Sequence, residues 1–315
     1  MPSTIIEWFS DNGLLFGLAL LDGLAYAALV FMVAVGLNLV FGVLRIVNVA
    51  HGSLFAIGAY TAASIGIFFA SLGLPMWAGY VALVLSALLV GAVLGPLIEK
   101  LLLRRIYGHE DVLQLLVTFA LFMILEDVQK LIWGVQPIMQ DAPMKFLGTV
   151  DIPFGDDFIP FTAYQLFVLP GVAVATLAAL AWFLRRTLTG RVIVAVTTDK
   201  EAATAMGIDA AKIMLLTFSF GAGLAALGGA LASPTTSLVP GVGASTIVLS
   251  FAVVATAGLG QIEGAALTSL MIGLGRSIAV YFAPEFEVVV PYIIMVAVLL
   301  VRPQGLFGVL ETRRV

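Results

Sequence analysis

Long apolar stretches separated by short polar ones make up most of this chain. A helix that crosses a bilayer needs about 20 apolar residues, and nine segments approach or exceed that length: 14–44, 51–72, 76–98, 112–133, 163–184, 213–232, 243–258, 265–282 and 287–301. The first is too long for one straight span, so we expect it to tilt strongly or to break near Gly36, Asn38 or Gly42. The seventh and ninth are short enough to be half-inserted. The pattern predicts an all-α polytopic integral membrane protein with about 8–9 transmembrane helices, some of them broken or half-inserted.

Composition supports this fold class and excludes several functions. The chain is 61% hydrophobic and 11% charged, whereas soluble domains carry about 25% charged residues. Its net charge of −4 leaves no basic face for nucleic acid. With no Cys and only two His, the sequence offers no disulfide, thiolate nucleophile or metal site. The first residues lack a basic segment, so we expect no cleavable signal peptide. Residues 1–315 therefore form a single membrane domain in contact with lipid.

The distribution of basic residues predicts the orientation. The segment 185–212, RRTLTGRVIVAVTTDKEAATAMGIDAAK, holds five of the 15 basic residues, and basic loops remain cytoplasmic. With nine crossings, the N-terminus is then periplasmic, the C-terminus is cytoplasmic, and twelve of the 15 basic residues lie inside. The loop 134–162 falls outside and is acidic. The cytoplasmic placement of most basic residues and the external placement of the acidic loop therefore agree with each other.

The same cytoplasmic segment contains a predicted short helix. Thr198 and Glu201 have the spacing of a capping box, Gly207 can end the helix, and Asp209 can cap the next span. An apolar patch with a polar rim could then enter a groove on a partner. The residues of the patch, the rim and the following turn are Asp199, Lys200, Glu201, Ala202, Ala203, Met206 and Ile208. The alternative is a solvated connector between two spans.

Polar residues inside apolar segments are costly and suggest function. Asn38, Asn48, His51 and Ser53 cluster in GLNLVFGVLRIVNVAHGSLFAIGAY. They could line a translocation pathway or form its gate. Alternatively, Asn48 caps a helix and His51 bonds neighbouring carbonyl groups. Gln261, in the turn GLGQIEG, is a further pathway candidate.

Other patterns indicate structure more than chemistry. Glu126 and Lys130 can pair at i,i+4, which is a simpler explanation of these charges than an ion relay through Glu126 and Asp127. The glycines from Gly258 to Gly264 lie between two membrane segments, so they predict a tight turn and no dinucleotide site. Small residues every fourth position predict close helix packing; they are Ala87, Gly91 and Gly95, and Gly221, Ala225 and Gly229.

Motifs for ATP binding and for catalysis are missing. The sequence has no G-x-x-x-x-G-K-[ST] loop and no arrangement typical of a hydrolase. An intramembrane enzyme is therefore disfavoured, and we expect no cofactor on this chain. Active transport would take its energy from a partner or from an ion gradient.

Several blocks, in the same order, resemble the permeases of branched-chain amino acid ABC importers, in particular the first of the two permease types. The blocks are residues 36–62, LVTFALFMILEDV at 116–128, DKEAATAMGIDAAKI at 199–213, GLGQIEGA at 258–265 and LLVRPQGLFG at 299–308. The resemblance implies a helical bundle in the bacterial inner membrane that pairs with a second permease. It also implies two cytoplasmic ATPase subunits that hold ATP and Mg, and a periplasmic substrate-binding protein. The helix near 199–208 would be the coupling helix that docks in an ATPase groove.

The resemblance leaves the substrate open. Gln261 and Glu263 stand where the family usually has Ser and Pro. Members of the family also import urea, short amides and aromatic acids, so these remain alternatives to branched-chain amino acids. An ion-coupled secondary transporter is the alternative from another class, and it would need a charged site near the membrane midplane.

Overall fold

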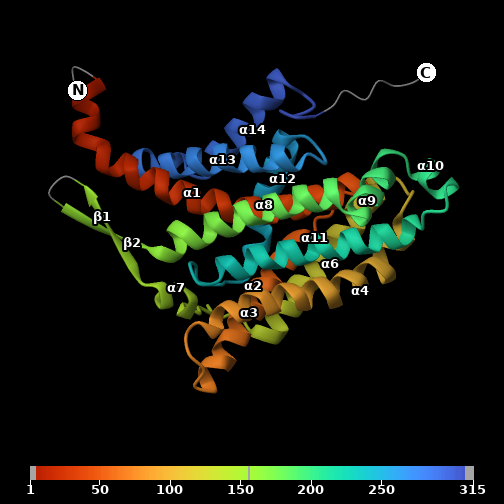
Figure 1. Ribbon diagram of the computed structural model, residues 1–315, viewed down its shortest axis with the longest axis horizontal. Helices are drawn as coiled ribbons and strands as arrows, with labels where there is room; N and C mark the ends of the chain where they lie inside the picture. The colour runs from red at the N-terminus through yellow and green to blue at the C-terminus, as the bar shows by residue number, and fades with distance from the viewer. Residues whose placement is uncertain (1–4, 155–156, 309–315) are drawn as a thin grey trace.

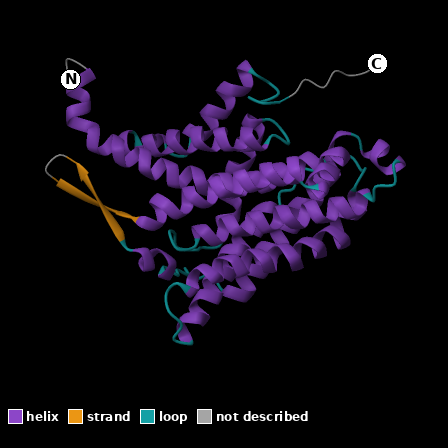
Figure 2. Cartoon of the chain, viewed as in Figure 1, coloured by secondary structure: helices purple, strands orange, loops and turns teal. Residues whose placement is uncertain are grey.

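The computed structural model describes residues 5–154 and 157–308. Most long helices lie side by side (Figure 1), and a two-stranded hairpin is the only sheet among the described residues (Figure 2). The elements in chain order are α1 Ile5–Leu44, α2 His51–Ser71, α3 Ala78–Leu89, η1 Val90–Leu94, α4 Gly95–Ile98, η2 Glu99–Leu103, α5 Arg104–Ile106, α6 Asp111–Trp133, α7 Ala142–Leu147, β1 Thr149–Phe154, β2 Asp157–Thr162, η3 Tyr164–Val168, α8 Leu169–Arg186, α9 Leu188–Thr198, α10 Lys200–Ala205, α11 Ala210–Ala232, α12 Val242–Ala257, α13 Ile262–Phe282, η4 Pro284–Phe286 and α14 Val290–Val301.

The described residues include 6 helices long and apolar enough to cross a membrane. Two of them, 78–106 and 164–186, run through π-helical turns without interruption. α12 and α14 have 16 and 12 residues, which span about 24 and 18 Å against a hydrocarbon core of about 30 Å. A polytopic membrane protein is therefore confirmed. Nine crossings and the orientation of the termini stay predictions.

Most predicted segments coincide with helices. α2, α6, α11, α12 and α13 each begin and end within three residues of the expected bounds. Local signals explain this agreement, because apolar runs bounded by turn residues mark both ends of these helices.

The first segment was expected to break or to tilt strongly, and the break is wrong because α1 is one unbroken helix of 40 residues. Its glycines permit close approach between helices instead of a kink. A Cβ on Gly36 would lie 2.8 Å from the Gly221 carbonyl oxygen, and one on Gly42 would lie 3.1 Å from Gly260 Cα. Neighbouring backbones occupy the space that a side chain would take at these two positions, which accounts for the glycines without a break.

Two predicted loops contain regular structure. The helix that begins at Ala78 continues to Ile106, so most of the expected loop 99–111 is helical. The loop 134–162 contains α7 and an antiparallel hairpin in which Thr149 pairs with Thr162. The all-α prediction is wrong at this hairpin. In β1 Val150, Ile152 and Phe154 alternate along the chain, which is the period of an extended strand.

α1 forms the centre of the bundle, with 83% of its most apolar window buried. α13, α11, α12 and α8 pack along it, and α2 packs against α11. The hairpin and α7 lie at one end of the molecule, and α9 and α10 lie at the opposite end (Figure 1). These two ends are called the hairpin end and the α10 end below.

Candidate functional site

The short helix predicted in the central loop is present as α10, with a different cap. Asp199 is the N-cap, and its Oδ1 accepts a bond of 2.9 Å from Ala202 N. Thr198 is the last residue of α9, and its hydroxyl donates to the Val194 carbonyl oxygen at 2.9 Å. The predicted capping box of Thr198 and Glu201 is therefore wrong by one residue, because Thr198 already bonds within the preceding helix.

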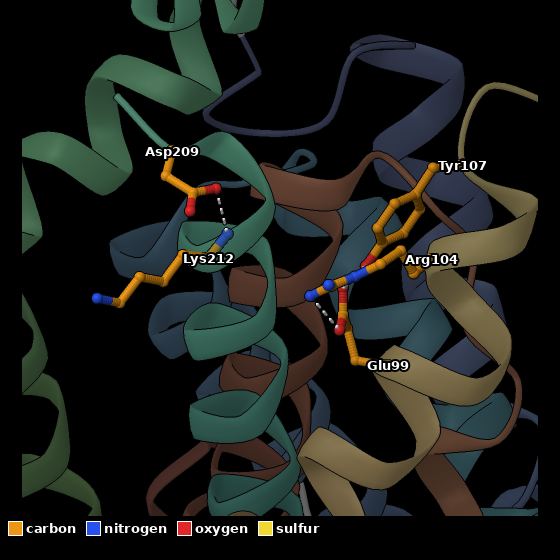
Figure 3. Close-up of polar contacts among 5 residues, drawn as sticks. All are labelled: Glu99, Arg104, Tyr107, Asp209 and Lys212. Atoms are coloured by element: carbon orange, nitrogen blue, oxygen red, sulfur yellow. Dashed lines mark hydrogen bonds and ion pairs between the residues drawn. The ribbon is translucent and has the colours of Figure 1, made fainter. Parts of the chain in front are cut away.

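The end of α10 follows the prediction. Gly207 has φ +86°, a left-handed conformation that glycine adopts without a steric cost. Ile208 N donates to the Ala203 carbonyl oxygen at 3.1 Å, which is the bond pattern of a Schellman C-terminus. Asp209 Oδ1 accepts from Lys212 N at 3.0 Å and caps α11 as predicted (Figure 3).

The exposed face of α10 is smaller than the sequence predicts. Ala202 is exposed and Met206 has 84% of its surface exposed, but Ala203 is only 6% exposed. Ala203 belongs to a buried cluster that includes Val196 and Ile213. It therefore holds α10 on its own bundle and is not available to a partner.

A buried carboxylate supports the α10 end of the bundle. Glu99 has no exposed surface, accepts from Arg104 at 2.9 Å and accepts from the Tyr107 hydroxyl at 3.3 Å (Figure 3). Burial, and next the negative charge of Glu99, raise the pKa of the Tyr107 phenol, which keeps it a neutral donor. Lys200 Nζ lies 5.9 Å from the centre of the Tyr107 ring. These contacts join the 78–106 helix to the first residue of α10.

A polar cavity of about 330 Å³ separates α10 from the end of α1. Its walls come from residues 43–46, from Tyr107 and Gln114, and from residues 196–201. The connection between α9 and α10 and the connection between α1 and α2 therefore share one space.

The predicted pathway residues form two separate groups. In the first, the Asn38 side chain donates to the Gln261 carbonyl oxygen at 2.7 Å and accepts from Gly260 N at 2.6 Å. Asn38 is fully buried. It joins α1 to the turn between α12 and α13, whose Gly258 and Gly260 have positive φ as a tight turn requires. Asn38 and Gln261 are thus brought together, but through the backbone of Gln261.

The second group joins α1, α2 and α6. Asn48 Oδ1 accepts from Ala50 N at 3.1 Å, His51 Nε2 contacts the Val33 carbonyl oxygen at 3.2 Å, and Ser53 donates to the Phe122 carbonyl oxygen at 3.2 Å. All three side chains are at most 1% exposed. Asn48 Nδ2 and His51 Nδ1 have no hydrogen-bond partner among the described residues, although buried polar atoms are usually bonded. Their role in a pathway or gate stays a prediction.

A third polar group, at the hairpin end, was not predicted as a site. Asp22 on α1 accepts a hydrogen bond from the Tyr281 hydroxyl, and Arg276 on α13 pairs with Glu287. The Arg276 guanidinium also lies 4.1 Å from the centre of the Tyr26 ring. Asp22 and Arg276 are charged residues inside the apolar segments 14–44 and 265–282, and that signal could have identified them.

Comparison with known proteins identifies the sequence family of this chain. Residues 19–299 match the sequence family described as the permease component of branched-chain amino acid transport systems. The chain belongs to this permease family. Proteins of the family are transport components. Separately, the described residues hold no group of three or more His, Cys, Asp or Glu that could bind a metal ion.

Named relatives match this permease along nearly its whole length. The high-affinity branched-chain amino acid permease protein LivH of Salmonella typhimurium is 25% identical over 97% of this chain and 100% of its own. BraD of Pseudomonas aeruginosa is 27% identical over 94% of this chain and 97% of its own. A probable LivH of Methanocaldococcus jannaschii is 27% identical, covering 92% of each chain. The solved structure of PsaBC from Streptococcus pneumoniae in complex with Fab aligns with a TM-score of 0.48 and 15% identity, over 96% of this chain and 98% of its own.

Proposed function

We propose that this chain is the membrane-spanning permease subunit of an ATP-driven importer of branched-chain amino acids in the bacterial inner membrane. The observation that carries the proposal is the match to LivH along 100% of that relative, together with the family match over residues 19–299. In this machine the chain pairs with a second permease, and a periplasmic binding protein delivers the substrate. ATP and Mg are held by two separate ATPase subunits.

The coupling contact with the ATPase is assigned to α10. This helix projects at the α10 end (Figure 1), and its exposed Ala202 and Met206 offer a small apolar surface. Ala203 and Lys200 hold the opposite face against the bundle. A helix with both ends capped and one face anchored can transmit a displacement to the cavity beside α1.

Reconstitution tests the function. The chain is placed in proteoliposomes with its partner permease, ATPases and binding protein, and the uptake of L-leucine is measured. We expect uptake that requires ATP and the binding protein. Leucine uptake by the chain alone, driven by a sodium or proton gradient, would contradict the proposal and support a secondary carrier. Import of urea, amides or aromatic acids in place of leucine would support the ATP-driven importer but contradict branched-chain amino acids as its substrate.

A surface substitution tests the coupling role. Met206→Asp places a charge in the exposed apolar surface of α10 without touching the core, since this side chain is 84% exposed. We expect ATP hydrolysis stimulated by the loaded binding protein to fall about tenfold, which corresponds to about 1.4 kcal/mol of lost contact energy. Met206→Leu, which keeps the side chain apolar at the same exposed position, is the matched control and should retain stimulation. Full stimulation of an intact Met206→Asp complex would show that α10 is only a connector.

Ala203→Asp is unsuitable for this purpose. The Ala203 side chain is buried with Val196 and Ile213, so a carboxylate there would lack a partner and would disturb folding.

A further inference from the structure

Two adjacent cavities lie beside α1 at the hairpin end of the bundle. The first, here called the polar cavity, has a volume of about 210 Å³; Asp22, Arg276 and Tyr281 line it together with apolar residues such as Ala25 and Leu169. The second, of about 230 Å³, is almost entirely apolar. Both are lined by Tyr26, Leu29 and Thr236, so these three side chains form the boundary between them.

We propose that the pair of cavities is a binding site for a zwitterionic α-amino acid with a branched aliphatic side chain. The proposal rests on the proposed function and assigns its substrate contacts to named residues. The charged groups bind to the polar cavity, and the aliphatic group enters the apolar one. None of the predicted pathway residues lines either cavity.

The polar cavity presents one charge of each sign from two helices. Arg276 reaches it from α13, and a guanidinium has five N–H donors in a geometry that suits a carboxylate. Glu287 occupies only its Nη2, so other donors remain for the α-carboxylate of a substrate. Asp22 reaches the cavity from α1, and Tyr281 bonds its Oδ2. Asp22 Oδ1 then remains for the α-ammonium group.

The charges lie within helices that are otherwise apolar, where a charged side chain costs several kcal/mol unless it is compensated. The ion pair of Arg276 with Glu287 and the contact of Arg276 with Tyr26 supply part of that compensation. A bound zwitterion places its ammonium group beside Asp22 and its carboxylate beside Arg276. Each charge then gains an opposite partner, and the net charge of the site does not change. Urea carries neither charge, so it could form hydrogen bonds with Asp22 and Arg276 but no ion pair with either.

The apolar cavity suits a branched aliphatic group. Its walls include Leu29, Val33, Phe55, Val242 and Leu249. Three hydroxyl groups on α12 in its wall are bonded within that helix: those of Ser245 and Thr246 donate to the Val242 carbonyl oxygen at 3.1 and 2.8 Å, and that of Ser250 donates to the Thr246 carbonyl oxygen at 2.8 Å. These three hydroxyls therefore do not require a polar ligand, and the mainly aliphatic wall favours apolar side chains.

Tight contacts close the apolar cavity toward the centre of the bundle. The carbonyl group of Val33, which lines the cavity, contacts His51 at 3.2 Å. One turn further along α1, Gly36 meets Gly221 and His51 so closely that an added Cβ would be 2.8 Å and 3.2 Å from them. A substrate in the two cavities would therefore be held on the hairpin side of His51.

Protection of a single cysteine by substrate tests the site. The chain contains no Cys, so Leu29→Cys supplies one thiol at the boundary of the two cavities. The assembled transporter in proteoliposomes is treated with a methanethiosulfonate reagent in the absence of ATP. At an L-leucine concentration about ten times the dissociation constant, about nine-tenths of the sites are occupied. We therefore expect the thiol to be labelled about tenfold more slowly than without leucine. Leucinol, which lacks the carboxylate, and 4-methylvalerate, which lacks the ammonium group, should not protect.

Substitutions of the charged residues separate binding from general effects. Arg276→Gln and Asp22→Asn, each in the Leu29→Cys background, should abolish protection by leucine. Lys130→Gln is the matched control, because it removes a cation that also forms ion pairs, with Glu126 and Asp127 at 3.1 Å, but lies outside both cavities. A cysteine at Thr149 in the hairpin should be labelled at the same rate with and without leucine.

The outcomes distinguish this proposal from the proposed function. If the complex imports leucine but leucine leaves the labelling of Leu29→Cys unchanged, the site is wrong and the function stands. The same conclusion follows if leucine still protects in both Arg276→Gln and Asp22→Asn. If the complete complex imports no leucine, the proposed function fails first. Where one charge variant fails to assemble, the other decides the result.

Discussion

The Asn38 side chain links α1 to the turn between α12 and α13 by two hydrogen bonds in the bundle centre. Its side-chain amide satisfies both a backbone donor, Gly260 N, and a backbone acceptor, the Gln261 carbonyl oxygen, and it has no exposed surface. A buried polar group that loses its partner keeps its full desolvation cost. Asn38 therefore supplies two hydrogen bonds between α1 and the turn between α12 and α13, beside the close contact of Gly42 with Gly260.

Replacement of Asn38 should destabilise the protein. Asn38→Ala leaves two backbone groups without their partner, and we expect a loss of about 1–3 kcal/mol for each group that stays buried. Thermal unfolding of the purified complex measures the effect. Ser71→Ala is the control, since its hydroxyl makes only an exposed local bond to the Phe68 carbonyl oxygen. Equal unfolding temperatures for both variants would mean that the α12–α13 turn holds its place by packing alone.

For single residues, the sequence predicts which side chains matter better than it predicts which atoms they contact. Asn38 and Gln261 were both expected to be important, and they do meet, but the atom involved in Gln261 is its carbonyl oxygen. Which of several polar atoms bonds is decided by three-dimensional packing, which a linear pattern does not contain. The same limit applies to Asp22 and Arg276, which lie 254 positions apart in the sequence and become neighbours only through the pairing of α1 with α13.

Among the elements, α11 is the helix on which the packing prediction can be tested most directly. Its small residues Gly221 and Gly229 were predicted to allow close approach. Gly221 packs against α1 at Gly36, and Gly229 packs against α2 at the Phe55 carbonyl group. The spacing of small residues therefore correctly predicted close contacts with two different helices.

Gly229→Ala should disrupt this packing. The added Cβ would overlap the Phe55 carbonyl oxygen, and a backbone atom cannot move aside as a flexible side chain can. We expect a loss of about 1–3 kcal/mol, as for other overpacked cores, measured by the yield and thermal unfolding of the purified complex. Gly223→Ala on the same helix is the control, because its Cβ would lie 3.5 Å from the Ala87 carbonyl oxygen, an ordinary contact. If both variants unfold at the same temperature, the contact between Gly229 and Phe55 leaves room for a methyl group and α2 and α11 are not tightly packed there.

Element boundaries were predictable where local signals determine them. Gly207 ends α10 and Asp209 caps α11, as expected from residue type alone. The extension of the third segment to Ile106 was not predicted, because Lys100, Arg104 and Arg105 look like a loop in sequence. In the structure Glu99 is buried and pairs with Arg104 five residues later on the same continuous helix. These charges therefore pair along a helix and do not mark a loop.

For the whole molecule, the orientation in the membrane is the property that most needs a direct test. The basic residues predict that the α10 end is cytoplasmic and the hairpin end is external. Cysteines placed singly at Thr149, Arg105 and Thr189 all lie at exposed positions. In intact cells, an impermeant maleimide should label the cysteine at 149 and leave those at 105 and 189 unlabelled until the cells are opened. Labelling at 189 from outside would reverse the topology.

The continuity of α1 has a mechanical consequence. A helix of 40 residues is about 60 Å long, and it lines the two cavities of the hairpin end with residues 22–33 and the cavity beside α10 with residues 43 and 44. Between these cavities α1 has no break in its helical hydrogen bonding, so we expect this part of the helix to move as one unit. Alternating exposure of these cavities then requires the surrounding helices to rotate about α1 as rigid bodies. Amide hydrogen exchange along α1 should accordingly stay slow and unchanged with and without nucleotide, whereas exchange in α6 and α14 changes between the two states.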